Sequence, residues 1–197
     1  MLHPSIHIKW LNDEKGYGLF ASSFIPKGTI TWALDKMDKV YLAKQVQEMD
    51  NHYQQQIFKY GYRNAKGHYI VCWDLAKYMN HSCDPNTLSP GLKFDIAIKD
   101  IQAGEEITTD YSSLNLEETL NCACGIGHCR EQIEDKDFET YVDDWDDKIN
   151  QAFTQINKVP QKLWPWVEEQ KILEQIQKKG GKIPSIIKHR YKEGLSL

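Results

Sequence analysis

The chain has 197 residues, 41% of them hydrophobic and 26% charged, which suffices for one domain with a buried core, alone or with an appendage. Its net charge of −4 and isoelectric point near 6.0 disfavour nucleic acid as a direct partner, because phosphate binding favours a basic surface. No apolar run approaches the roughly 18 residues of a membrane helix, and the start, MLHPSIHIKW, lacks the features of a secretion signal. We therefore expect a cytoplasm-like compartment and no membrane partner, while delivery to a nucleus or a host cell stays open.

The first half of the chain alternates short strand-like runs with turn residues. The runs IHIKW, GTITWAL, HYIVCW and FDIAI are separated by Gly, Pro, Asp and Asn. This pattern is typical of small β-sheets rather than of regularly alternating strands and helices. One helix is predicted among these runs, over residues 40–49. A strand, a loop and a group of cysteines follow between Gly104 and Arg130.

The last third of the chain has helical periodicity. Apolar residues recur three or four positions apart over residues 138–156, and a second helical pattern covers residues 167–179. Acidic side chains dominate from Glu131 to Asp147, with Lys136 as the only base. This acidic run has two interpretations, a solvated helix face or a surface that attracts a basic protein.

Three of the five cysteines lie close together in the stretch CACGIGHC. Cys122, Cys124 and Cys129 follow the pattern C-x-C-x4-C, and the glycines between them let the backbone fold around one centre. Three thiolates suit a tetrahedral zinc site that takes a fourth ligand from elsewhere. Disulfides are the alternative, but an odd number of cysteines, the missing secretion signal and the strain of such short loops favour zinc.

Four residues are candidates for the fourth zinc ligand. Cys72 alternates with apolar neighbours in HYIVCW, which is typical of a buried strand thiol. His128 is adjacent to Cys129 and is awkwardly placed to complete the same tetrahedron. His81 and Cys83 lie in the stretch YMNHSCDPNT. We favour Cys83, which would tie this stretch through the metal to the cysteine group far downstream.

Five stretches occur in an order that resembles a known enzyme family. They are GYGLFAS at 16–22, IPKGT at 25–29, YMNHSCDPNT at 78–87, AIKDIQAGEEITTDYS at 97–112 and CACGIGHCR at 122–130. Together they resemble SET-domain protein lysine methyltransferases that carry a post-SET zinc segment. The resemblance covers roughly residues 5–130.

The resemblance implies a fold, a division into segments and an activity. The fold is mainly β (α+β), a SET fold of small twisted β-sheets with a pseudoknot that brings the N-H-S-C segment beside the strand before Tyr111. A SET domain is expected over residues 5–115, a post-SET zinc segment over 116–134 and a C-terminal helical extension over 135–197. The activity implied is methyl transfer from S-adenosylmethionine to the ε-amine of lysine in a protein substrate, a histone being one candidate. Zinc is implied as a structural cofactor.

The resemblance also implies roles for individual residues. Tyr111, at the end of GEEITTDY, matches the active-site tyrosine. Tyr62 is the preferred candidate for a second tyrosine of the lysine channel, with Tyr60 as the alternative. The implied cofactor-binding residues are Lys15, Gly16, Tyr17, Asn80, His81 and Tyr111. The implied zinc ligands are Cys83, Cys122, Cys124 and Cys129.

Two further expectations concern the product and the substrate. One follows from a departure from the family pattern, and the other from the acidic composition of one segment. Thr109 stands where related enzymes often carry the phenylalanine or tyrosine that limits how many methyl groups fit. Because threonine is smaller than either ring, we expect a pocket that permits di- or trimethylation. The acidic run favours a basic protein or tail as the substrate. The target lysine and the oligomeric state do not follow from the sequence.

Two other functions compete with this prediction. One is a SET-fold module that binds a peptide or cofactor without turnover, which the intact Tyr111, Asn80 and His81 disfavour. The other is a zinc-bound interaction protein in which the cysteine cluster is fused to a helical hairpin. The second alternative predicts no binding of S-adenosylmethionine.

Overall fold

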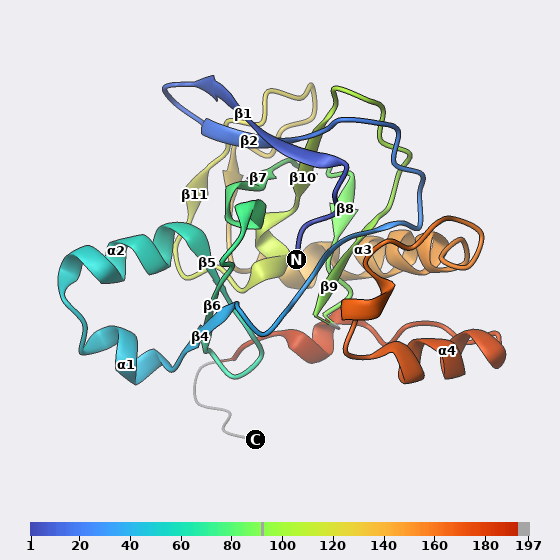
Figure 1. Ribbon diagram of the computed structural model, residues 1–197. Helices are drawn as coiled ribbons and strands as arrows, with labels where there is room; N and C mark the ends of the chain where they lie inside the picture. The colour runs from blue at the N-terminus through green and yellow to red at the C-terminus, as the bar shows by residue number, and fades with distance from the viewer. Residues whose placement is uncertain (92, 193–197) are drawn as a thin grey trace.

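The computed structural model describes residues 1–91 and 93–192, so residues 193–197 of the predicted helical extension lie outside it. Its strands form small sheets (Figure 1) with the orders β1-β2-β10-β7, β3-β9-β8 and β4-β6-β5, beside a β11-β12 hairpin. The strands are β1 (Ile6–Asn12), β2 (Gly16–Ala21), β3 (Ile30–Ala33), β4 (Lys39–Tyr41), β5 (Gly61–Arg63), β6 (Tyr69–Val71), β7 (Asn80–His81), β8 (Thr87–Leu88), β9 (Phe94–Ala97), β10 (Glu106–Thr109), β11 (Leu120–Asn121) and β12 (Gln132–Ile133). The predicted fold of small sheets is confirmed.

The helices gather in two places. Two α-helices lie beside the β4-β6-β5 sheet, and two others, one of them the longest, follow the cysteine segment (Figure 1). The α-helices are α1 (Ala43–Gln47), α2 (Asn51–Tyr60), α3 (Asp137–Phe153) and α4 (Gln170–Lys178), and the 3-10 helices are η1 (Leu75–Tyr78), η2 (Tyr111–Leu114), η3 (Trp164–Trp166) and η4 (Ile186–His189). The helices predicted at 138–156 and 167–179 are therefore present as α3 and α4.

The predicted helix over residues 40–49 is only partly right. Residues 39–41 form β4, which pairs with β6, and the helix α1 begins at Ala43. Valine and tyrosine at 40 and 41 favour a strand when a partner strand is available. The longer helix α2 was not predicted, because Ile57 is its only buried residue and its face offers little apolar periodicity.

The main hydrophobic core joins the C-terminal extension to the second sheet. Phe94 and Ile96 of β9 pack in one cluster with Phe138, Trp145 and Ile149 of α3. Trp145 is 2% exposed and meets Phe138 edge-to-face at 5.5 Å between ring centroids. The extension is thus packed against the strands rather than tethered beside them, although its boundary at residue 135 remains a prediction.

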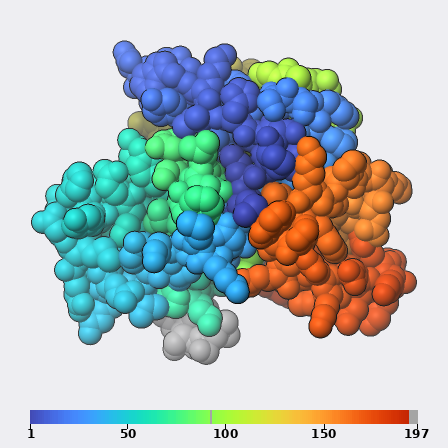
Figure 2. Space-filling model, viewed as in Figure 1, coloured from blue at the N-terminus to red at the C-terminus, as the bar shows by residue number. Residues whose placement is uncertain are grey.

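The space-filling view shows the N-terminal strands together with two further masses (Figure 2). The segment with α1 and α2 protrudes on one side, and the C-terminal extension on the other. Within the described residues, none of the helices combines the length and the apolar character needed to cross a membrane.

Candidate active site and zinc centre

Strand β10 brings three distant sequence motifs together. It pairs antiparallel with β2, where Glu106 lies opposite Phe20. On its other edge it pairs parallel with β7, where Thr108 and Thr109 lie opposite Asn80 and His81. The GYG, N-H-S-C and GEEITTDY stretches therefore meet on one sheet, and the last two are the segments that the predicted fold brings together.

The side chain of Asn80 connects the N-H-S-C stretch to the GYG and GEEITTDY stretches. Its amide nitrogen Nδ2 donates to the backbone oxygen of Tyr17 at 3.1 Å and to Oε1 of Glu106 at 2.8 Å. A Cβ atom on Gly18 would lie 2.6 Å from that same Glu106 oxygen and 3.0 Å from Nδ2 of Asn80. A side chain at position 18 would therefore displace the Glu106 carboxylate or the Asn80 amide.

The turn before β2 leaves backbone exposed beside Asn80. The backbone N–H of Lys15 donates to Oδ1 of Asn12 at 2.8 Å, which fixes the turn. Gly16 has φ of +70°, and a Cβ atom there would meet nothing within 4 Å. The space over Gly16 is thus open to a ligand that approaches the backbone closely, and glycine adopts this φ without strain.

Tyr111 begins the turn that follows β10. Its hydroxyl donates to the backbone oxygen of Met79 at 2.8 Å, so the ring reaches back to the residue before Asn80. Burial raises the pKa of Tyr111 to about 12, and the negative charge of Glu106 acts in the same direction. The side chain is therefore a neutral phenol near neutral pH, which can donate and accept hydrogen bonds but is not an anionic base.

His81 points its ring away from the open turn. Its Nδ1 accepts the backbone N–H of Tyr111 at 3.1 Å, and its Nε2 lies 3.3 Å from the sulfur of Cys83. Since Nδ1 accepts, the proton of the neutral ring belongs on Nε2, where it faces that sulfur. Burial lowers the pKa of His81 to about 4. Only its backbone is thus free to contact a cofactor.

Aromatic side chains form a run beside the GYG turn. Tyr17 lies edge-on to Trp10 at 5.1 Å and to Tyr78 at 5.6 Å between centroids, and Tyr78 meets Tyr60 at 5.6 Å. Trp10 is 50% exposed and Tyr17 is 45% exposed. Tyr62 lies elsewhere: it packs against the core cluster of Trp32, Cys72 and Ala76. The geometry therefore favours Tyr60 over Tyr62 as the tyrosine next to the site.

Four cysteine thiols converge beside the N-H-S-C stretch. The sulfur atoms of Cys83, Cys122, Cys124 and Cys129 all lie within 4.8 Å of one another. Tetrahedral zinc with bonds of about 2.3 Å to sulfur places its ligands about 3.8 Å apart, so this group fits zinc in number, chemistry and spacing.

Of the other candidates for the fourth zinc ligand, Cys72 and His128 do not belong to this group, and His81 only borders it through its 3.3 Å contact with the sulfur of Cys83. Cys72 is buried in a separate core cluster, as its alternating pattern predicts. His128 is exposed, as expected of a loop histidine. Ser82 accepts the backbone N–H of Asp84 at 3.1 Å, so its hydroxyl bonds its own turn.

Arg130 is a residue of this centre that the sequence did not single out. Its backbone N–H and its Nε lie 3.4 and 3.3 Å from the sulfur of Cys83, and its Nη2 lies 2.7 Å from Oδ1 of Asp110. Asp110 is 2% exposed and immediately precedes Tyr111. The signal available was the adjacency of Arg130 to Cys129, but only the fold reveals which carboxylates surround it.

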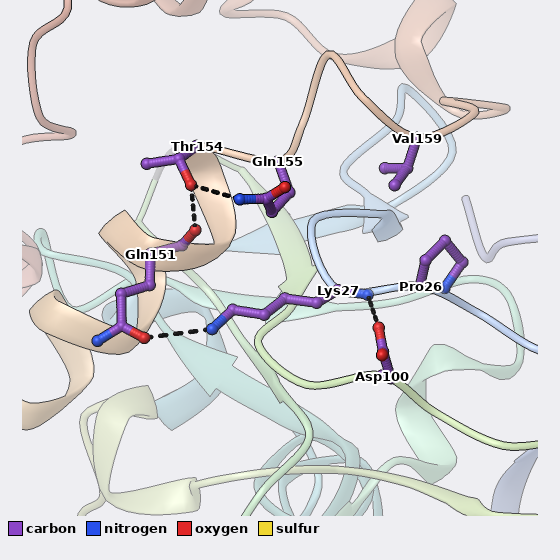
Figure 3. A pocket seen from close by; sticks show the side chains of 7 residues that line it. All are labelled: Pro26, Lys27, Asp100, Gln151, Thr154, Gln155 and Val159. Atoms are coloured by element: carbon purple, nitrogen blue, oxygen red, sulfur yellow. Dashed lines mark hydrogen bonds between the residues drawn. The ribbon is translucent and has the colours of Figure 1, made fainter.

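A separate cavity of about 550 Å³ lies between the loop at Pro26 and the end of α3 (Figure 3). Lys27 contacts Asp100 and Gln151 across it, and Thr154 and Gln155 bond each other beside it. None of the predicted site residues lines this cavity. Its polar groups are paired with one another, so the candidate active site is the junction of β2, β7 and β10.

Comparison with known proteins agrees with this arrangement. Residues 16–112 match the model of the SET domain family. Histone-lysine N-methyltransferase mes-4 of Caenorhabditis elegans is 32% identical over 142 residues, covering 58% of this chain and 15% of that protein. Histone-lysine N-methyltransferase Set2 of Drosophila melanogaster is 28% identical over 131 residues, covering 60% of this chain and 6% of that protein.

Among solved structures, the methyltransferase domain of human histone-lysine N-methyltransferase SETMAR aligns with a TM-score of 0.47 and 21% identity, covering 68% of this chain and 58% of that one.

The sheets, the converging motifs and the family match together define a SET-domain protein with a four-cysteine cluster. The chain carries a SET domain over residues 16–112. It spans less than a sixth of the length of the two curated relatives named above.

Proposed function

We propose that this chain is a protein-lysine N-methyltransferase that uses S-adenosylmethionine. The observation that supports this most strongly is the meeting of the GYG turn, Asn80 and Tyr111 around one strand of the matched SET domain. S-adenosylmethionine, when bound, would supply an electrophilic methyl group on its sulfonium. The residues of the chain then have to bind it, orient it and admit a neutral amine.

The cofactor would be held mainly by backbone and amide groups. The open backbone at Lys15, Gly16 and Tyr17 and the amide and backbone of Asn80 and His81 are the groups proposed to bind it. The exposed aromatic face of Tyr17 offers a partner for a cation or a flat ring. Glu106 would keep the amide of Asn80 oriented through its 2.8 Å contact.

The acceptor lysine must lose its proton before it can attack. A free lysine has a pKa of about 10.4, and burial in an apolar channel lowers that value, as does a neighbouring positive charge. Tyr111, as a neutral phenol, would orient the amine and the methyl group through its oxygen rather than remove a proton as an anion. Such positioning is worth on the order of 7 to 11 kcal/mol in well-oriented reactions.

Zinc is proposed as a structural cofactor bound by Cys83, Cys122, Cys124 and Cys129. Because Cys83 lies three residues after Asn80, the metal would fix the loop that follows the cofactor-binding strand. Zinc here would supply rigidity rather than chemistry, since four thiolates leave no open coordination position.

A basic protein or tail is proposed as the substrate. Asp143 and Asp147 on α3 are exposed and have no ion-pair partner among the described residues, so they add negative charge to the surface. Their neighbour Asp144 is paired with Lys148 at 2.6 Å, and Asp135 and Glu139 are paired with Arg190. Asp143→Asn together with Asp147→Asn should raise the apparent KM for a basic substrate, and an unchanged KM would remove this support.

The degree of methylation is proposed to reach two or three methyl groups. Thr109 is 5% exposed on β10 and is smaller than the rings found at this position in related enzymes. Mass spectrometry at saturating cofactor should detect di- or trimethyllysine, and only monomethyllysine would contradict the proposal.

The transferase proposal is tested against its alternatives with two measurements. The chain is incubated with labelled S-adenosylmethionine and either core histones or whole-cell extract, and cofactor binding is measured by calorimetry. The proposal predicts binding and label in protein lysine. Binding with no label in any substrate would favour a SET-fold module without turnover. Absence of binding would favour a zinc-bound interaction protein.

A further inference from the structure

Arg130 makes contacts on both sides of its guanidinium. On one side, its backbone N–H and Nε approach the sulfur of Cys83, the proposed zinc ligand from the N-H-S-C loop. On the other side, Nη2 donates to Oδ1 of Asp110 at 2.7 Å. The arginine side chain is 13% exposed and that of Asp110 is 3% exposed, so this ion pair is shielded from water.

Asp110 in turn fixes the turn that begins with Tyr111. Its Oδ1 accepts the backbone N–H of Ser112 at 3.1 Å, and its backbone oxygen accepts the N–H and the hydroxyl of Ser113. These are the bonds that shape η2. A carboxylate held by Arg130 therefore caps the helical turn on which Tyr111 stands.

The same guanidinium reaches the start of helix α3. Nη1 lies 3.3 Å from Oδ2 of Asp137 and 3.3 Å from the hydroxyl of Ser112. The guanidinium carbon Cζ lies over the ring of Tyr141, 4.7 Å from the ring centroid. Arg130 thus touches the cysteine cluster, the Tyr111 turn and the C-terminal extension at once.

We propose that Arg130 is a positioning residue that couples the order of the zinc centre to the placement of Tyr111. This proposal deepens the proposed transferase function and rests on it for its effect on activity. With zinc bound, the Cys83 sulfur and the Asp110 carboxylate hold the guanidinium from both sides. Loss of the metal frees Cys83 and removes one side of that support, and the Tyr111 turn then loosens.

The proposed positioning role requires the planar guanidinium group of arginine. Arginine presents its Nε–H and Nη–H groups in fixed directions, so one side chain can face a sulfur and two carboxylates together. Lysine keeps the charge but offers a single ammonium that cannot span Cys83 and Asp110. Arg130→Lys is therefore the informative variant, because it preserves the net charge and all four cysteines.

Arg190→Lys is the matched control. Arg190 also pairs with carboxylates at the start of the extension, Asp135 and Glu139, and lies over the ring of Phe138. Among the described residues, the hydrogen bonds and ion pairs of the Arg190 side chain go to Asn115, Asp135 and Glu139, and none goes to the cysteines or to Asp110. Its replacement perturbs the anchoring of the extension without touching the proposed coupling.

The experiment is amide hydrogen exchange on the zinc-loaded chain, with zinc content measured by elemental mass spectrometry. For Arg130→Lys we expect one zinc per chain and exchange at Tyr111, Ser112 and Ser113 at least fivefold faster than in the wild type. Exchange in β9 should stay unchanged, and Arg190→Lys should stay within twofold at all these amides. Removing zinc from the wild type with a chelator should produce the same local increase, and chelation of Arg130→Lys should add little.

Wild-type exchange at these three amides in zinc-loaded Arg130→Lys would overturn the proposal. If Arg130→Lys loses protection in β9 as well, Asp137→Asn replaces it, because this change keeps Arg130 and every cysteine while removing the negative charge of one partner of the guanidinium. A smaller increase confined to Tyr111, Ser112 and Ser113 is then expected, and an increase spread over the whole chain would overturn the proposal.

Activity provides the second readout and separates the two proposals. In Arg130→Lys we expect kcat to fall at least tenfold while the Kd for S-adenosylhomocysteine stays within twofold, since the GYG turn and Asn80 do not touch Arg130. A loss of cofactor binding with unchanged kcat would contradict a positioning role. If the wild type transfers no methyl group, the proposed function fails, whereas the exchange result still decides the role of Arg130.

Discussion

At the residue scale, Glu106 lies where three distant segments meet. Its carboxylate accepts from Asn80, faces the position where a side chain on Gly18 would be, and raises the pKa of Tyr111. One acidic group thus touches or influences each part of the candidate site. The family motif includes this glutamate, but only the structure shows that its carboxylate lies where a side chain on Gly18 would be.

Gly18→Ala should weaken cofactor binding. The added Cβ would lie 2.6 Å from Glu106 and 3.0 Å from Asn80, so the carboxylate and the amide must move apart. We expect the Kd for S-adenosylhomocysteine to rise at least tenfold by calorimetry. Gly127→Ala serves as a control, because a Cβ at Gly127 meets nothing within 4 Å. Equal affinity in the two variants would show that the Asn80–Glu106 contact does not matter for binding.

Site residues that belong to a short motif could be predicted from the sequence. Site residues that are selected by packing could not. The cysteine spacing and the N-H-S-C stretch predicted the group of four thiols that the structure brings together. Tyr60 and Tyr62 could not be separated, since they lie two residues apart and only the fold shows that Tyr60 ends α2 whereas Tyr62 lies on β5 and packs against Trp32. Arg130 could not be chosen because its partners come from three segments.

At the scale of elements, we propose that the cysteine segment depends on a bound metal for its shape. The β11-β12 hairpin has only two residue pairs, so hydrogen bonds alone give this segment little stability. Four thiols within 4.8 Å of one another take over that role when they bind zinc.

Zinc removal should therefore unfold the cysteine segment locally and lower the thermal stability of the chain. We expect one zinc per chain in the purified protein and a fall in Tm of several degrees after chelation, since loss of a ligand that binds only the folded state lowers stability. Cys83→Ser should reduce zinc content, whereas Cys72→Ser, outside the cluster, should not. Equal zinc loss from both variants would contradict the assignment of Cys83.

Helix α3 anchors the C-terminal extension through a buried tryptophan. Trp145→Ala should destabilise the chain by about 3 to 5 kcal/mol, the usual cost of truncating a large aromatic residue in a core. Chemical denaturation measures this free energy. Trp166→Ala, at a position 43% exposed, should cost much less. Similar losses for the two variants would mean that α3 does not pack as described.

Elements with a strong local pattern were predicted better than those stabilised by neighbours. The apolar spacing of residues 138–156 predicted α3, since the helix buries one stripe against the β9 strand. Helix α2 has a capping Asp50 that accepts from His52 but little apolar periodicity. Its position follows from the sheet β4-β6-β5 beside it, which a single segment of sequence does not reveal.

At the scale of the whole molecule, buried His3 should make stability depend on pH. Burial lowers the pKa of His3 to about 4, and nearby Lys162 acts in the same direction. Its Nδ1 accepts the backbone N–H of Ser5 at 3.2 Å, which requires an unprotonated nitrogen. A pKa lowered by folding stabilises the chain above the unfolded value of about 6.5, and this stabilisation is lost as the pH falls toward 4.

His3→Gln should therefore flatten the fall in unfolding free energy between pH 6.5 and pH 4. The expected difference from the wild type is on the order of 2 kcal/mol across this interval. Denaturation at several pH values measures the slope. The exposed His52→Gln variant should keep the wild-type slope, and a wild-type slope in His3→Gln would refute the interpretation.

The central claim, that Tyr111 serves a methyl-transfer site, is tested most directly by comparing Tyr111→Phe with Tyr53→Phe. Tyr53 is 63% exposed on α2, so its replacement controls for loss of a phenol. Each variant is incubated with S-adenosylmethionine and the substrate that the wild type labels, and methyllysine is quantified by mass spectrometry. We predict a loss of at least a hundredfold in rate for Tyr111→Phe and wild-type rate for Tyr53→Phe. Wild-type methyllysine formation by Tyr111→Phe would contradict the claim.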